Sequence, residues 1–121
     1  MNISIYSNSA DREQLCRWID SNGTLAFRQR KYSCCEGYDD FLRMLEQGQT
    51  DLLIISRDGA DGMESVIAAR ELQPETKLIW FSDDKAFGPQ SYWLNCTYFA
   101  VKPITADLLE NAISRCFTAN H

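Results

Sequence analysis

Two apolar runs in this chain end in polar residues that could take part in chemistry. Ser56 follows the run Leu52–Ile55, and Lys102 follows the apolar segment Thr97–Val101. A serine hydroxyl becomes a nucleophile only beside an activating base, and the sequence places no histidine or glutamate to serve Ser56. Asp58 lies two residues further along the chain. These residues predict a polar site around Ser56 and Lys102 without an evident activating base.

Length and composition exclude several classes of function. The chain of 121 residues has a net charge of −5, which argues against nucleic acid as the partner because phosphate binding needs clustered cations. The densest basic cluster, Arg28–Lys31, is interpreted as an exposed strand face. No apolar run approaches the ~20 residues that cross a bilayer, and the first six residues do not resemble a signal peptide. We therefore expect a single cytoplasmic domain over residues 1–121 that does not bind a membrane.

The cysteines do not form a metal-binding pattern. An odd number of cysteines without a secretion signal predicts reduced thiols. Cys16 and Cys116 fall on apolar helix faces and are expected in the core, whereas Cys34 and Cys35 are adjacent and unsuited to a shared tetrahedral site. The only histidine is His121. No metal site is expected. The five cysteines are Cys16, Cys34, Cys35, Cys96 and Cys116.

Strand and helix patterns alternate along the whole chain. The predicted strands are a short one around Ile3 and Ile5, then Leu25–Tyr32, Leu52–Ile55, Lys77–Phe81 and Thr97–Val101. The predicted helices follow them, with starts at Asn8 or Ser9, near Tyr38, at the capping-box pattern Asp61-x-x-Glu64, near Pro89 and at Thr105.

Five strand–helix units of this length predict an α/β fold. Such units form a parallel sheet with helices on both faces. For this size we expect a flavodoxin-like (βα)5 doubly wound sheet with strand order 2-1-3-4-5. The first and third strands are then neighbours at the switch point, so Ser7 and Ser56 should lie together at its crevice.

These residues together resemble the receiver (CheY-like) domain of two-component response regulators. In that family the first strand ends in an acidic pair that holds Mg²⁺, and the third strand ends in a phospho-accepting aspartate. The matching positions here are Ser7, Asn8 and Ser56. Ser82 and Lys102 match the residues that contact the phosphoryl group. Phe99 matches the aromatic switch position.

One segment resembles the LytTR-type subgroup of response regulators in particular. Ser91–Ile104 reads Ser-Tyr-Trp-Leu-Asn-Cys-Thr-Tyr-Phe-Ala-Val-Lys-Pro-Ile. The subgroup typically reads Ser-Tyr-x-x-(Asn/Gly)-Ala-x-(Asp/Tyr)-Tyr-Leu-x-Lys-Pro there. The resemblance therefore implies a signalling module of this subgroup. The subgroup's DNA-binding domain is absent from this sequence, so the chain is either a stand-alone receiver or a fragment of a longer protein.

The family comparison also implies that the phosphorylation chemistry is lost. Mg²⁺ prefers carboxylate oxygens, and all three family carboxylates are replaced at Ser7, Asn8 and Ser56. We therefore expect no bound Mg²⁺ and no phosphorylation. Lys102 would pair instead with Asp58 or Asp83. An alternative is an active receiver that uses Asp58 as a shifted acceptor.

Two further functions are open to a chain with this fold: binding a protein, and binding a flavin or nucleotide. The family uses the surface formed by its fourth helix, fifth strand and fifth helix for dimerisation or docking. The aromatic residues Tyr92, Trp93, Tyr98 and Phe99 map to this surface and predict a protein partner or a homodimer.

A flavin or nucleotide binder is the other alternative, because Tyr6–Ser9 precedes a helix start. The glycine that phosphate binding needs is missing there.

Overall fold

A computed structural model describes residues 1–25 and 29–117 of the chain. Five parallel strands form one sheet in the order β2-β1-β3-β4-β5. This order is that of the flavodoxin-like doubly wound fold, so the predicted fold class is confirmed. The strands are β1 (Asn2–Ser7), β2 (Lys31–Cys35), β3 (Leu52–Ser56), β4 (Lys77–Ser82) and β5 (Tyr98–Val101).

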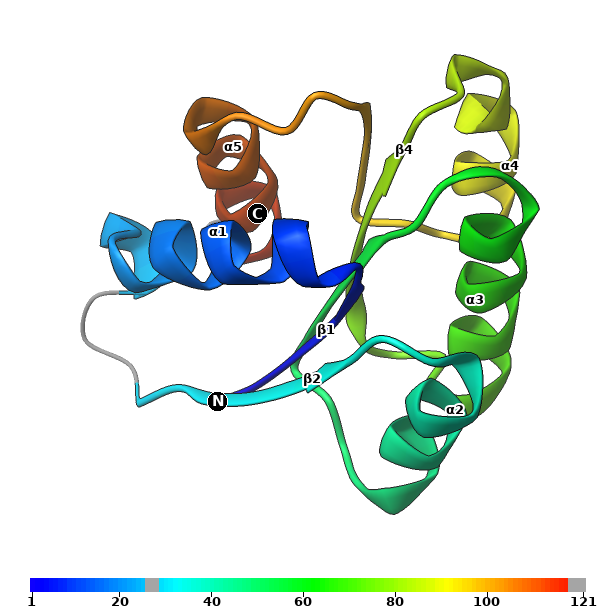
Figure 1. The fold of residues 1–121 in the computed structure, drawn as a ribbon, viewed down its shortest axis with the longest axis horizontal. Helices are drawn as coiled ribbons and strands as arrows, with labels where there is room; N and C mark the ends of the chain where they lie inside the picture. The colour runs from blue at the N-terminus through cyan, green and yellow to red at the C-terminus, as the bar shows by residue number, and fades with distance from the viewer. Residues whose placement is uncertain (26–28, 118–121) are drawn as a thin grey trace.

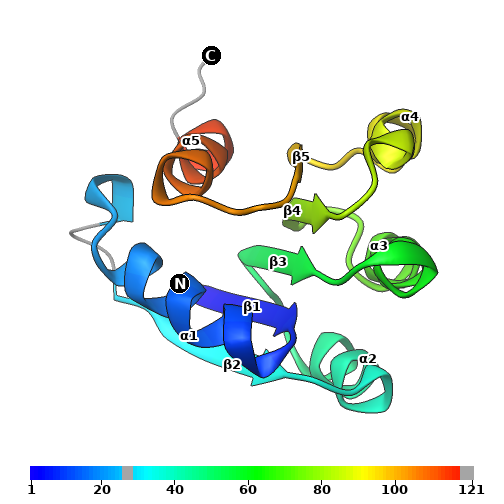
Figure 2. The same ribbon diagram turned by 45° about the horizontal axis from the view of Figure 1, so that its top comes forward.

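Helices cover both faces of the sheet. Figure 1 shows α1 and α5 on one side, and α2, α3 and α4 on the other. The helices are α1 (Ser9–Asp20), α2 (Tyr38–Gln47), α3 (Gly59–Leu72), α4 (Gly88–Trp93) and α5 (Ala106–Phe117), with 3₁₀ turns η1 (Gly23–Leu25) and η2 (Lys85–Phe87). Figure 2 shows the strands running side by side between these two layers.

The central strand β3 explains why the core divides into two layers. Side chains of a strand alternate between its faces. Leu52 and Ile54 pack against the α1 and α5 side, whereas Leu53 and Ile55 pack against the α2 and α3 side, and all four are fully buried. A continuous apolar run is therefore required in this strand because both of its faces are covered.

Several predicted helix starts are confirmed by local hydrogen bonds. Asn8 caps α1, because its side-chain oxygen accepts a hydrogen bond of 2.8 Å from the backbone N–H of Asp11. Thr105 caps α5 in the same way, through the N–H of Leu108 at 3.1 Å. Pro89 lies in the first turn of α4, where its missing N–H costs nothing.

The predicted start of the third helix is wrong by three residues. Helix α3 begins at Gly59, with Asp58 as its N-cap, rather than at the Asp61 capping-box pattern. The Asp61 carboxylate instead accepts a hydrogen bond of 2.8 Å from Arg57. Gly59 has φ +60°, a conformation that favours glycine, and this allows β3 to turn into α3 within two residues.

The predicted strand Leu25–Tyr32 is misplaced, because among its described residues only Lys31 and Tyr32 belong to β2. Leu25 ends the η1 turn, and residues 26–28, which include Arg28 of the basic cluster, lie outside the described part of the chain. Strand β2 begins at Lys31, which pairs with Asn2 of β1. The alternation of apolar and polar residues that suggested the strand therefore lies mainly before it.

Candidate functional site

Three buried serines end three neighbouring strands at one edge of the sheet. Ser7 ends β1 and pairs in register with Ser56, which ends β3. Ser82 ends β4, the next strand. All three are fully buried. The fold therefore brings together the residues that the sequence singled out, at the carboxyl ends where ligands of this fold class bind.

Each serine hydroxyl has a local hydrogen-bond partner. Ser7 Oγ donates to the backbone oxygen of Asn8 at 2.9 Å. Ser56 Oγ donates to Asp11 Oδ2 at 3.2 Å. The third hydroxyl, of Ser82, accepts a hydrogen bond of 3.2 Å from the N–H of Asp84. These contacts account for the burial of three polar side chains, since buried hydroxyls need partners.

Lys102 supplies the positive charge of the site. Its Nζ lies 2.8 Å from Asp58 Oδ1 and 3.4 Å from Asp11 Oδ2. The lysine side chain is only 18% exposed, so its charge depends on these carboxylates. Backbone pairing fixes its position, because its N–H donates to the oxygen of Ser82 at 2.8 Å.

The Lys102–Asp58 pair is one of the two ion pairs that the sequence predicted for Lys102. The other candidate, Asp83, accepts a hydrogen bond from the N–H of Gly59 instead.

Asp11 is the site residue that the sequence reading missed. It lies in the first turn of α1, and one carboxylate oxygen contacts both Ser56 and Lys102. A carboxylate therefore reaches the strand ends from a helix, although none of the strand-end positions carries one. The available signal was an acid in the first turn of the helix that follows β1, because that turn adjoins the end of the strand.

The side chain of Arg57, the residue after Ser56, contacts a different part of the molecule. Arg57 Nε donates to Asp61 Oδ2 at 2.8 Å, and its guanidinium lies 4.6 Å from the centre of the Tyr6 ring. Tyr6 Oη donates to Asp61 Oδ1 at 3.4 Å. Burial, followed by the charge of Asp61, raises the pKa of Tyr6 above its ordinary 10.0. Arg57 therefore takes part in this packed cluster.

A hollow of about 480 Å³ adjoins the site between α1 and the chain after β5. Its wall includes both charged residues of the Lys102–Asp11 contact, together with apolar side chains. Those apolar side chains make it a surface on which a ligand or protein segment could lie beside the ion pairs. The lining residues are Asp11, Gln14, Leu15, Trp18, Lys102, Pro103 and Ile104.

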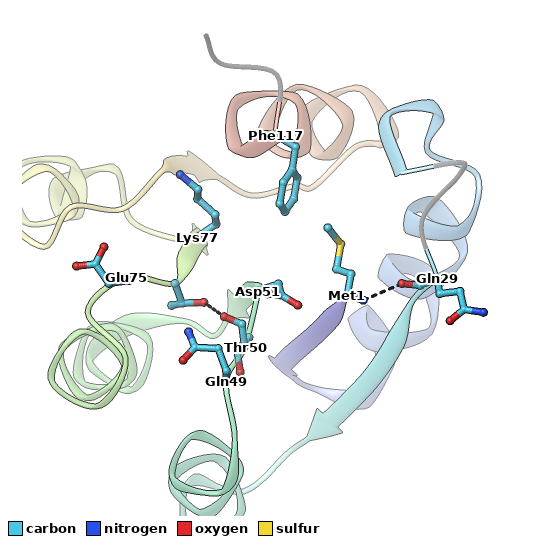
Figure 3. Close-up of a pocket in the computed structure, with 9 residues that line it drawn as sticks. Met1, Gln29, Gln49, Thr50, Asp51, Glu75, Lys77 and Phe117 are labelled. Carbon is cyan, nitrogen blue, oxygen red and sulfur yellow. Dashed lines mark hydrogen bonds between the residues drawn. The ribbon is translucent and has the colours of Figure 1, made fainter. Parts of the chain in front are cut away.

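A larger hollow of about 660 Å³ lies at the opposite edge of the sheet (Figure 3). Several polar groups there already serve the fold. Thr76 Oγ1 donates to the oxygen of Thr50, and the N-terminal ammonium of Met1 donates to the oxygen of Gln29 at 2.9 Å. Asp51 Oδ2 accepts a hydrogen bond of 2.7 Å from the N–H of Asn2. None of the strand-end residues that the sequence predicted as a site lines this hollow.

The predicted aromatic surface divides into exposed and packed residues. Tyr92 and Trp93 on α4 are 77% and 78% exposed, with their rings edge to face at 5.8 Å. Phe99 is partly buried and meets Trp80 edge-on at 5.1 Å. Tyr98 packs against the core of the α1 and α5 side. Of these four residues, only Tyr92 and Trp93 therefore present large aromatic surfaces to solvent.

The carboxylates at the strand ends do not form a metal-ligand set. Asp11 and Asp58 both face Lys102, and an ammonium group disfavours a cation beside it. Within residues 1–25 and 29–117, no group of three or more His, Cys, Asp or Glu side chains could hold a metal ion. None of the helices in that part of the chain is long and apolar enough to span a membrane.

Comparisons with known proteins show the fold of the chain. No family model matches the sequence, and no curated protein is similar to it. Solved structures do match it, three of them at 14–19% identity. The response regulatory domain of MrkE from Klebsiella pneumoniae has a TM-score of 0.80 at 14% identity, with 98% of this chain and 96% of that chain covered.

Two other solved structures match over nearly the whole chain. The REC domain of AraT, a response regulator from Geobacillus stearothermophilus, has a TM-score of 0.78 at 19% identity, covering 97% of this chain and 92% of that chain. A CpaE2 pilus assembly protein from Sinorhizobium meliloti has a TM-score of 0.77 at 15% identity, covering 97% and 100%. The chain therefore has the receiver-domain fold.

Proposed function

We propose that this chain is a receiver-type signalling module that works by binding a protein rather than by phosphorylation. The observation that carries the proposal is the pairing of Lys102 with Asp58 and Asp11 at strand ends that bear serines. In an active receiver a lysine at this position would contact a phosphoryl group. Here two internal carboxylates already neutralise it. Phosphorylation would have to displace those contacts without a strand-end carboxylate to accept the phosphoryl group.

The same residues argue against a Mg²⁺ cofactor. The ion prefers several hard oxygen ligands, of which carboxylates supply the counter-charge. Ser7, Asn8 and Ser56 offer neutral groups, and each already has a hydrogen bond within the fold. We therefore expect no saturable change in tryptophan fluorescence on addition of millimolar Mg²⁺. Trp18 is a suitable reporter because it lines the hollow beside Lys102.

A phosphorylation assay tests the proposal directly. The chain is incubated with acetyl phosphate and Mg²⁺, with an active receiver in parallel as positive control, and its intact mass is measured. We expect an unchanged mass. A phosphoryl adduct that Asp58→Asn abolishes and Ser56→Ala leaves intact would instead establish the alternative, in which Asp58 is a shifted acceptor. Asp83→Asn is the matched control, since Asp83 lies on the neighbouring loop and hydrogen-bonds to Gly59.

The proposed interaction surface is centred on Tyr92 and Trp93. Aromatic residues concentrate binding energy at interface centres, and these two remain largely exposed. The partner is another protein or a second copy of the chain. Light scattering over a range of concentrations distinguishes the two cases. In either case, Tyr92→Ser with Trp93→Ser should abolish binding, whereas Tyr38→Ser on the far helix α2 should not.

The resemblance of Ser91–Ile104 to the LytTR-type subgroup supports the proposal that the module belongs to that group of regulators. In the fold, the segment forms the end of α4, the following loop and β5. A LytTR DNA-binding domain encoded directly downstream would support this assignment. One solved structure with the fold is described as a pilus assembly protein, so a downstream domain of another kind would place the module in a different setting.

The flavin or nucleotide alternative has less support. Its proposed phosphate site is the start of α1, where the Asn8 side chain already accepts the hydrogen bond of the Asp11 N–H. A phosphate at this helix start would compete with that cap. A purified protein that is colourless and releases no nucleotide on denaturation would exclude this function.

A further inference from the structure

Helix α1 and strand β2 face each other through a regular series of side-chain contacts. Near the start of the helix, Arg12 pairs with Glu36 at 3.4 Å. At its end, Asp20 accepts a hydrogen bond of 2.5 Å from Tyr32 Oη. The helix therefore runs antiparallel to the strand, and the two contacts fix their relative positions along both elements.

Cys16 and Cys34 lie midway between these two contacts. Cys16 is four residues from both Arg12 and Asp20, about 6 Å along the helix axis from each. Cys34 is two residues from both Glu36 and Tyr32, about 6.6 Å along the strand. The equal spacings place the two cysteines opposite each other, and Cys34 is one of the neighbouring groups that raise the pKa of Cys16.

The neighbouring cysteine points to the other face of the sheet. Cys35 is buried, with its Sγ 3.9 Å from the oxygen of Ile5 and 3.9 Å from Met44 Sδ of α2. Cys34 and Cys35 therefore have different surroundings, as alternation along a strand requires. Of the two, only Cys34 faces α1.

We propose that Cys16 and Cys34 are a redox-sensitive pair that forms a reversible disulfide between α1 and β2. All five cysteines are free thiols in this structure, so it represents the reduced state. The proposal is independent of the proposed function. The disulfide would join α1, the helix that carries Asp11, to the edge strand β2.

The reaction with a peroxide assigns separate roles to the two thiols. Cys34 is exposed, whereas Cys16 is half-buried, so the Cys34 thiolate attacks a peroxide oxygen and becomes a sulfenic acid as water leaves. Cys16 then attacks the sulfenic sulfur, and a second water is released. The two thiols lose two electrons and two protons, and the peroxide is reduced to two water molecules.

The surroundings of Cys16 support its role as the second thiol to react. Burial, followed by the neighbouring Cys34, raises the pKa of Cys16 to about 11. Near neutral pH it is therefore protonated and a poor first nucleophile. It reacts when Cys34, on the facing strand, has become an electrophile. A thiol of the glutathione type would reverse the bond by exchange.

Mass spectrometry after oxidation tests this proposal. The full chain is treated with hydrogen peroxide, alkylated and digested with trypsin without reduction. We expect the peptide of residues 13–17 linked to that of residues 32–43, with fragment ions placing the bond at Cys34. A reductant should release both peptides. The link should vanish in Cys16→Ser and in Cys34→Ser.

Cys35→Ser is the matched control, because it keeps the facing pair and removes the adjacent thiol. The link should persist in this variant. Four results would overturn the proposal: a bond at Cys35, a bond between two chains, over-oxidised Cys34 beside an alkylated Cys16, or two alkylated thiols. Since Cys34 is exposed, Cys34→Ser is expected to fold, and loss of the link can be read directly in that variant.

Discussion

Lys102 Nζ lies 2.8 Å from Asp58 Oδ1, so the lysine that follows β5 pairs with the residue at the N-cap position of α3. The contact joins two loops at the carboxyl edge of the sheet. It also determines what the site can do, because an ammonium group held by an internal carboxylate is less available to an incoming anion.

This ion pair should contribute little to stability, despite its position. The Asp58 side chain is 55% exposed, so solvent screens the interaction. We expect Asp58→Asn to lower the free energy of unfolding by about 0.5 kcal/mol. Urea denaturation of Asp58→Asn, Lys102→Met and the double variant measures their coupling. Glu71→Gln, on the exposed side of the same helix, should show no coupling to Lys102→Met. A coupling energy well above 1 kcal/mol would mean that the pair is effectively buried.

Gly62 should tolerate no side chain. A Cβ at this position would lie 2.3 Å from the backbone oxygen of Arg57 and 3.3 Å from Trp80 Nε1. The backbone at Arg57, between β3 and α3, would have to shift, so Gly62→Ala should lower the free energy of unfolding by roughly 2–4 kcal/mol. Gly88→Ala is the matched control, because nothing lies within 4 Å of its Cβ position. Equal unfolding free energies for the two variants would contradict the close packing seen here.

Arg70 joins the end of α3 to the segment that precedes β5. Its guanidinium donates to the backbone oxygens of Leu94, Thr76 and Asn95 at 2.8, 2.8 and 2.7 Å. A lysine cannot reproduce this planar set of donors. We expect Arg70→Lys to cost about 2 kcal/mol of unfolding free energy. Arg43→Lys should cost much less, since the ion pair that Arg43 forms with Asp40 is exposed. Thermal and urea denaturation would measure both.

The sequence determines the fold more completely than the site. Apolar runs such as Leu52–Ile55 identify the central strands, because a strand covered on both faces must be apolar throughout. The edge strand β2 has no such signal, since most of Lys31–Cys35 is exposed or half-buried. Its register comes from pairing with β1, and pairing between distant segments cannot be read from local alternation. The predicted strand Leu25–Tyr32 failed for this reason.

The site shows the same limit at the level of single residues. Ser7, Ser56, Ser82 and Lys102 could be predicted because each follows an apolar strand pattern. The role of Asp11 could not, because it depends on the direction in which α1 leaves β1. The carboxylate of Asp11 reaches Ser56 across 45 residues of sequence. Only the packing of α1 on the sheet brings the two groups together.

Buried thiols should make the chain less stable in mild alkali. Burial raises the pKa of Cys116 and of Cys35 to about 11, and that of Cys96 to about 12, from the ordinary value of 9.0. Between pH 9 and 11 the unfolded chain has lost protons that the folded chain still holds. Because the unfolded state then binds fewer protons, the free energy of unfolding falls as pH rises through this window. Below about pH 8 these thiols should have no effect.

Urea denaturation from about pH 8 to about pH 10, with a reductant present, measures this slope before most tyrosines ionise. Burial also raises the pKa of Tyr6 and Tyr32 above 10.0, so their contribution begins at higher pH. Cys96→Ala should fall in stability less steeply than the unmodified chain, because it lacks the thiol with the highest pKa of the three. Ser33→Ala is the control and should keep the slope, since Ser33 is exposed and its replacement removes no titratable group. Parallel pH profiles for the unmodified chain and Cys96→Ala would show that Cys96 titrates alike in the folded and unfolded states.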